Sequence, residues 1–106
     1  MQAIDRAALD LQTAGDADLA REVLDLFAGQ CRSILPRLVD ATLPSDRRAD
    51  LAHTLKGSAA GVGAERVRAL ADAAEPRLRA GDGPVPLDDL AEAVAAALAE
   101  IEGRTP

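Results

Sequence analysis

Aromatic residues are nearly absent from this chain of 106 residues, because Phe27 is the only one and there is no Trp or Tyr. This absence removes any platform on which nucleic-acid bases could stack. The hydrophobic residues, 48% of the chain, are therefore mostly Ala, Leu and Val, which suit closely packed helices better than a β-sandwich. The length fits one compact domain, residues 1–106, with one modest core.

Basic residues, cysteine and histidine are also scarce. Twelve Lys and Arg stand against eighteen Asp and Glu, for a net charge of -6, which argues against a nucleic-acid partner. Cys31 is the only cysteine and His53 the only histidine, which excludes an internal disulfide and the usual Cys/His zinc site. We therefore expect no metal in this chain and a reducing, cytoplasmic location.

Long hydrophobic runs are missing too. No run approaches the roughly 18 to 20 apolar residues that a membrane span requires. Residues 1–12 mix charged with apolar side chains and contain no signal-peptide core. We expect a soluble, complete chain without membrane contact.

Gly and Pro divide the sequence into helical segments, with no strand and no internal repeat. Apolar spacing predicts helices over about 4–11, 16–42, 45–62, 64–81 and 87–102. Asp16 or Asp18 is expected to cap the second helix and Ser45 the third, while Pro36 should kink its helix and Pro76 kink or end its own. The predicted fold is all-α, an antiparallel up-and-down four-helix bundle with a short extra N-terminal helix.

The segment 45–62 has an unusual outer face. At 100° per residue the core stripe is Leu51, Leu55, Ser58 and Val62, and His53 faces away from it with Ala49, Lys56, Gly57 and Ala60 nearby. Such small neighbours leave the imidazole clear, so that another surface can dock flat against it. Gly inside a helix costs about 1 kcal/mol relative to Ala, which a need for close approach would explain.

Lys56 is the only Lys among the twelve basic residues, and it lies one helical turn from the only His. Imidazole is a good transient acceptor because much of it is neutral and nucleophilic near pH 7. A compact ammonium nearby can balance the charge of a phosphoryl group on the ring. Each feature alone has an ordinary surface explanation, but together they indicate a phosphoryl-accepting site.

Residues 52–60, AHTLKGSAA, followed by GVGAER, resemble the signature of histidine-containing phosphotransfer (HPt) domains. The similarity extends to the Leu26–Phe27 pair, the Gly-Ala turn after the His helix and the final amphipathic helix. This resemblance implies a four-helix bundle in which His53 takes a phosphoryl group from a receiver aspartyl phosphate and passes it to an Asp of another receiver. The implied partners are response-regulator receiver domains and a hybrid histidine kinase.

The resemblance also implies roles for neighbouring residues. Lys56 would balance charge, Gly57 and Ala60 would admit the receiver, and Ser58 would support the His helix. Gln30 resembles a polar residue that bonds the phosphoryl site from the neighbouring helix. The chain itself would need no cofactor and show no turnover, since the Mg²⁺ belongs to the receiver, and we expect a monomer.

Three further residues are candidates for a place beside the site. Glu75 resembles a second polar neighbour of the histidine, often Gln, although an acid there would repel a phosphoryl group. Arg66 and Arg68 are candidates for assisting receiver docking. Their placement requires the structure.

The main alternative is a helical interaction module that docks receiver or kinase domains without phosphotransfer. A histidine-kinase dimerisation region usually has an acid directly after its His, where Thr54 stands here. A P-loop would need Lys and then Ser or Thr after its last Gly, where Ala64 and Glu65 follow. A hydrolase would need a Ser, Cys or Asp partner at triad spacing, and none is evident.

Overall fold

The computed structural model describes residues 2–81 and 83–103, and these contain five helices and no strand. The helices are α1 Arg6–Gln12, α2 Ala17–Leu38, α3 Ser45–Val62, α4 Glu65–Ala80 and α5 Asp88–Ile101. The prediction of an all-α fold is confirmed. Asp82, part of the predicted loop 81–86, lies outside the described residues.

Local signals set most of the helix ends. The Asp16 side chain accepts a hydrogen bond from Leu19 N at 3.1 Å, so Asp16 caps α2 as predicted. Gly63, with φ 76°, ends α3 in the left-handed conformation that glycine adopts most readily. The prediction of Ser45 as a cap is wrong, because Pro44 (φ -57°, ψ 139°) occupies the extended flanking position and Ser45 is already helical.

Helix α2 ends at Leu38, about four residues before the predicted end near 42. The Asp40 side chain accepts hydrogen bonds from Thr42 N at 2.9 Å and Thr42 Oγ1 at 2.6 Å, which fold this segment into a turn. Buried Arg48 donates from Nε to Leu38 O at 2.8 Å. A carbonyl at the helix end is thereby satisfied.

Neither internal proline divides its helix. The second helix continues past Pro36 to Leu38, and α4 continues past Pro76 to Ala80, so an early end at Pro76 is wrong. Both prolines are exposed, and the carbonyls that lose a helical partner can bond water instead.

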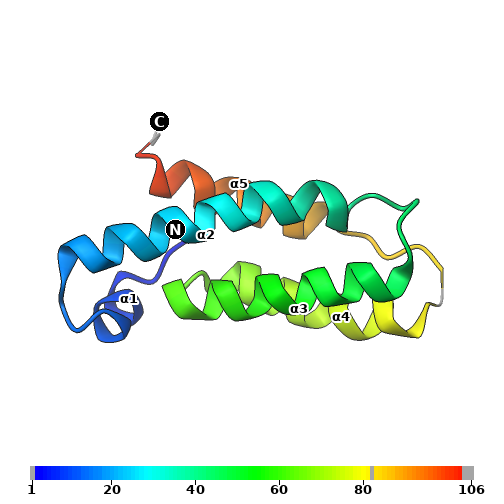
Figure 1. Ribbon diagram of the computed structural model, residues 1–106, viewed down its shortest axis with the longest axis horizontal. Coiled ribbons are helices and arrows are strands. Elements are labelled where there is room, and N and C mark those ends of the chain that lie inside the picture. The colour runs from blue at the N-terminus through cyan, green and yellow to red at the C-terminus, as the bar shows by residue number, and fades with distance from the viewer. Residues whose placement is uncertain (1, 82, 104–106) are drawn as a thin grey trace.

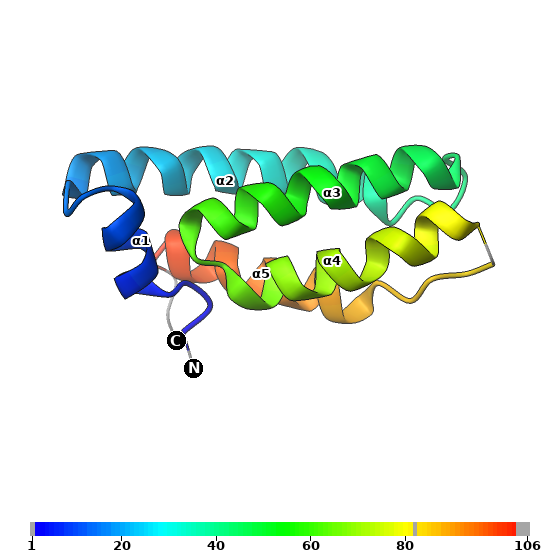
Figure 2. The same cartoon turned by 90° about the horizontal axis from the view of Figure 1, so that it is seen from below.

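The four longer helices lie along one axis of the molecule, and the chain reverses direction at each connection (Figure 1). Packing joins α2 to α3 and α5, and α4 to α3 and α5, with the α3–α4 pair the most extensive. Viewed from below, α3 and α4 lie next to each other while α1 lies across the end of the molecule (Figure 2). Over the described ranges, none of the helices has the length and apolarity needed to cross a bilayer.

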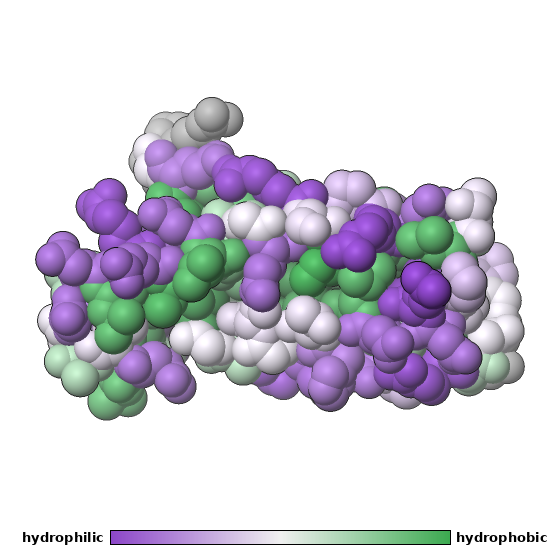
Figure 3. Space-filling model, viewed as in Figure 1, coloured by the Kyte–Doolittle hydropathy of each residue, from purple (hydrophilic) through white to green (hydrophobic). Residues whose placement is uncertain are grey.

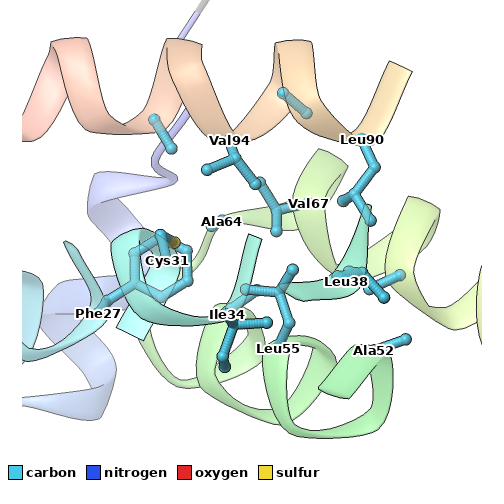
Figure 4. Packing of buried hydrophobic residues seen from close by; sticks show 14 of the residues in the cluster. Phe27, Cys31, Ile34, Leu38, Ala52, Leu55, Ala64, Val67, Leu90 and Val94 are labelled. Carbon is cyan, nitrogen blue, oxygen red and sulfur yellow. The ribbon is translucent and has the colours of Figure 1, made fainter. Parts of the chain in front are cut away.

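The core is built from side chains of all the longer helices. Leu38, Leu55, Val67, Leu90 and Val94 are at most 2% exposed and converge between the helices (Figure 4). Alanines fill the closest contacts, among them Ala52, Ala59, Ala71, Ala93 and Ala97. Such small side chains let the helices approach one another, so α3 and α4 can pair tightly beneath the outer face of α3.

Backbone N–H groups of the N-terminal segment bind the Glu100 side chain and a backbone carbonyl, and so hold this segment to the other helices. Glu100 accepts from Ala3 N at 3.1 Å and from Ile4 N at 2.7 Å. Asp5 N donates to Gly63 O at 2.8 Å. A side chain on Gly63 would place Cβ 2.8 Å from the Asp5 carbonyl oxygen, so this junction requires glycine.

Candidate functional site

His53 lies in the middle of α3 with its side chain 65% exposed. The ring is held on one side only, since Nδ1 lies 3.1 Å from Glu75 Oε1 on α4. Close pairing of α3 with α4 puts Glu75 within this reach. The predicted exposure of the imidazole is therefore found, and α4 supplies the group that orients the ring.

Glu75 is the centre of the site's electrostatics. Its side chain is 19% exposed, and its pKa falls from 4.5 to about 2, chiefly through the His53 bond, with further contributions from Lys56 and Arg79 that outweigh burial. An ionised carboxylate only accepts hydrogen bonds. Nδ1 of His53 therefore carries the hydrogen of this contact, and Nε2 of the neutral ring keeps its lone pair.

Lys56 extends from α3 toward the same carboxylate. Its Nζ donates to Glu75 Oε1 at 3.2 Å and to Asp72 Oδ1 at 3.4 Å. These contacts raise the pKa of Lys56, the Glu75 bond contributing most. The ammonium stays charged, one turn from the imidazole and against the helix that orients it.

Arg79 completes the charged side of the site. Its Nη2 donates to Glu75 Oε2 at 3.2 Å, and its Nη1 donates to Asp50 Oδ1 on α3 at 2.9 Å. We call the group Asp50, Lys56, Asp72, Glu75 and Arg79 the charged flank of His53. Each oxygen of the Glu75 carboxylate thus has a cationic partner.

The surface of α3 that faces α2 is different in character. A shallow hollow of ≈ 280 Å³ is lined by Val23, Leu26, Phe27, Gln30, Gly57, Ser58, Gly61 and Val62. We call this group the apolar flank. Hydrophobic side chains gather along the groove between α2 and α3, beside a pale area on α3 (Figure 3), and Leu26 is 70% exposed there.

The fold does not require glycine at positions 57 and 61. A Cβ added to Gly57 or Gly61 would meet nothing within 4 Å, and neither residue has a positive φ. A helical Gly costs about 1 kcal/mol relative to Ala. Packing within the chain therefore does not explain these two glycines, which leave the backbone of α3 uncovered.

Two of the other predicted site residues belong to the apolar flank, and one belongs to neither flank. Gln30 is exposed on α2 across the hollow from Gly57, and Ser58 is half-buried beside it. Ala60 is exposed. Ala49, expected on the outer face, is instead fully buried. The angular spacing of residues along a helix does not say how much of α3 the neighbouring helices cover.

Arg66 and Arg68 begin α4, at its far end from Glu75. Arg68 donates to Glu65 within the same helical turn, at 2.9 Å from Nε and 2.6 Å from Nη2. Nothing in these contacts brings either arginine to the imidazole. Within the described ranges, no group of three or more His, Cys, Asp or Glu is arranged to hold a metal ion.

Sequence reasoning missed Asp50, Asp72 and Arg79. A partial signal exists, because Asp72, Glu75 and Arg79 lie at i, i+3 and i+7, on one stripe of a helix. Knowing that this stripe faces the histidine requires the α3–α4 pairing. The spacing alone predicts only a solvated charged face.

The comparison with protein families agrees with this geometry. The family model described as the Hpt domain matches residues 22–104. Neither the curated proteins nor the solved structures contain a match to the chain. The matched region includes the helices that carry His53 and Glu75 and most of the helix that carries Gln30. The chain therefore belongs to the Hpt domain family, whose members take part in histidine phosphotransfer in two-component phosphorelays.

Proposed function

We propose that His53 is the phosphoacceptor of a phosphorelay intermediate, receiving a phosphoryl group from an aspartyl phosphate of one receiver domain and passing it to an Asp of another. The observation that carries this proposal is the 3.1 Å contact of Nδ1 with the Glu75 carboxylate on an otherwise exposed ring. In a neutral ring this contact puts the hydrogen on Nδ1 and leaves the lone pair on Nε2, as a nucleophile requires.

The transfer needs no separate proton acceptor, because no proton leaves the ring when the new bond forms. The Nε2 lone pair attacks phosphorus, the Nε2–P bond forms, and the P–O bond to the receiver's aspartate breaks with its electron pair left on the carboxylate. The ring then carries Nδ1–H and phosphorylated Nε2, and so has a positive charge. Glu75 faces that charge from the opposite edge of the ring, which offsets the repulsion expected between an acid and the phosphoryl group.

Lys56 would balance the phosphoryl charge, and its raised pKa keeps it protonated for that role. Gly57 and Ala60 would admit the receiver beside His53, Gln30 would bond the phosphoryl site from α2, and half-buried Ser58 would support the His helix. The open space at Gly57 supports this assignment. Exposed Leu26 adds an apolar contact to the same docking surface.

In this proposal the chain is a phosphocarrier without turnover of its own. It acts as a single domain, an antiparallel four-helix bundle and a monomer in the cytoplasm, exchanging phosphoryl groups with response-regulator receivers and a hybrid histidine kinase. The chain needs no cofactor, because the receiver holds the Mg²⁺ and the acidic pocket in which the phosphoryl group moves.

The test is incubation with a phosphorylated receiver domain and Mg²⁺, comparing wild type with His53→Gln. We expect acid-labile, base-stable phosphate on the wild type alone, with equal helical circular dichroism for both proteins. Label on both proteins would mean that another residue accepts the group. Receiver binding that is unchanged by His53→Gln, with no label on wild type from a panel of receivers, would instead support the interaction module.

A further inference from the structure

The charged flank extends beyond the residues that can touch a phosphoryl group. Arg79 sits between two carboxylates, with Nη2 3.2 Å from Glu75 Oε2 and Nη1 2.9 Å from Asp50 Oδ1. Asp50 lies on α3 three residues before His53, whereas Arg79 lies on α4 four residues after Glu75. The guanidinium therefore links the two helices, and an unbroken chain of contacts runs from Asp50 through Arg79 and Glu75 to the imidazole.

Two side chains compete for one oxygen of Glu75, so the carboxylate needs the Arg79 contact to keep its orientation. Its Oε1 is shared between His53 Nδ1 and Lys56 Nζ, while its Oε2 is bound by Arg79 alone among the contacts found. A carboxylate held at only one oxygen can turn about its terminal torsion, which is broad. The flexible Lys56 stem could then follow either oxygen, and the imidazole would lose its acceptor.

The planar guanidinium is suited to hold such a carboxylate in place. Its donors have a fixed fork geometry, so that binding Asp50 with one nitrogen fixes the direction of the other. The Arg79 side chain is 45% exposed and the Glu75 side chain is 19% exposed, so the carboxylate is the more buried partner of this bond.

We propose that Arg79, anchored by Asp50, is a positioning residue that fixes the Glu75 carboxylate and thereby sets which nitrogen of His53 carries the proton. The inference rests on the proposed function, in which Nε2 must be free for phosphoryl transfer. Arg79 touches neither the ring nor the phosphoryl group. Its effect passes through Glu75, as the third group of a hydrogen-bonded triad acts through its histidine.

The decisive measurement is the tautomer of His53 in the free protein. Because the chain contains a single histidine, the two ring nitrogens give unambiguous ¹⁵N NMR signals in uniformly labelled protein. We expect predominantly Nδ1–H in wild type and a mixture of both tautomers in Arg79→Gln. Arg79→Lys should restore part of the Nδ1–H population, and Asp50→Asn should shift it less than Arg79→Gln.

Arg77 provides a matched control on the same helix. Arg77→Gln removes the same charge from an exposed position that lies outside the charged flank, so the tautomer should remain as in wild type. Labelling of His53 by a phosphorylated receiver should be about tenfold slower in Arg79→Gln, the low end of what outer partners of a positioned histidine contribute. It should be unaffected in Arg77→Gln.

The two measurements separate the two proposals. An unchanged Nδ1–H tautomer in Arg79→Gln, or a shifted tautomer with normal transfer, overturns the role of Arg79. Absence of label on wild-type His53 would refute the proposed function, even if the tautomer depends on Arg79. Equal changes in Arg77→Gln and Arg79→Gln would show a general charge effect and also overturn the inference.

Discussion

The two flanks of His53 differ in almost every property. The flank toward α4 is charged and internally bonded, with Glu75 contacted by three side chains. The flank toward α2 is small and apolar, with bare backbone at Gly57 and an exposed Leu26. In the proposed function, the charged flank would fix the proton position of the imidazole and the apolar flank would accommodate the receiver, so that a single exposed histidine combines a fixed proton with open access.

The division also explains why the acid beside the histidine is tolerated. Lys56 and Arg79 both bind Glu75, and its contact with the ring is at Nδ1, not at the nitrogen that would carry the phosphoryl group. Negative charge near a phosphoryl site is unfavourable only when nothing neutralises it. In this site, Lys56 and Arg79 neutralise the Glu75 carboxylate that they bind.

The largest expected effect comes from obstructing the apolar flank. Gly57→Gln should lower receiver-dependent transfer roughly 10- to 100-fold, because a side chain in the contact surface costs about 1–3 kcal/mol of overpacking. Labelling by a small donor such as phosphoramidate should be nearly unchanged. Gly29→Gln on α2, another helical glycine with open space around it, is the matched control, and equal loss in both variants would contradict the docking role.

A pH series tests the charged flank. The Glu75 pKa is lowered from 4.5 to about 2, so the ionised carboxylate stabilises the fold above about pH 4.5 and loses this contribution as the pH falls toward 2. The difference in unfolding free energy between wild type and Glu75→Gln should shrink as the pH falls from about 4.5 toward 2. Denaturant unfolding at each pH measures it, and a difference that grows on acidification would refute the assignment.

The smallest effect concerns stability alone. Gly57→Ala should raise the unfolding free energy by about 0.5–1 kcal/mol, since the added methyl meets no atom within 4 Å. Gly63→Ala should lower it, because φ is +76° and the new Cβ would lie 2.8 Å from the Asp5 carbonyl oxygen. Denaturant midpoints distinguish the two variants, provided that the unfolding free energy depends equally steeply on denaturant concentration in both. A destabilised Gly57→Ala would mean that the fold itself needs this glycine.

Sequence patterns located the helices well where a local signal exists. Apolar spacing between Pro44 and Gly63 predicted a helix capped by Ser45 and ending near Val62, which agrees with α3 except that Ser45 is already helical, and Asp16 is the cap of α2. The end of α2 was predicted too late, because the turn at Asp40 depends on side-chain bonds to Thr42 that compete with the helix.

The core face of α3 was predicted only in part. Leu51 and Ser58, placed in the core stripe, are half-buried, whereas Ala52 and Ala59 are fully buried. Alanine occurs on both the buried and the exposed faces of helices, so it does not mark the core face. The predicted core face therefore followed the larger Leu51. The reach of Glu75 to His53 was likewise unpredictable, since it depends on how α3 and α4 pair.

The hydrogen bonds of Glu100 to Ala3 and Ile4 join residues nearly a whole chain length apart. During synthesis this contact has no partner until the last helix has emerged, and its formation closes a loop that contains every other element. Ile4, which is fully buried, therefore has an incomplete native environment until α5 has been synthesised. Of the five helices described, α1 is synthesised before the others, yet the segment that leads into it is secured only by α5, although this segment precedes the region that the Hpt family model matches.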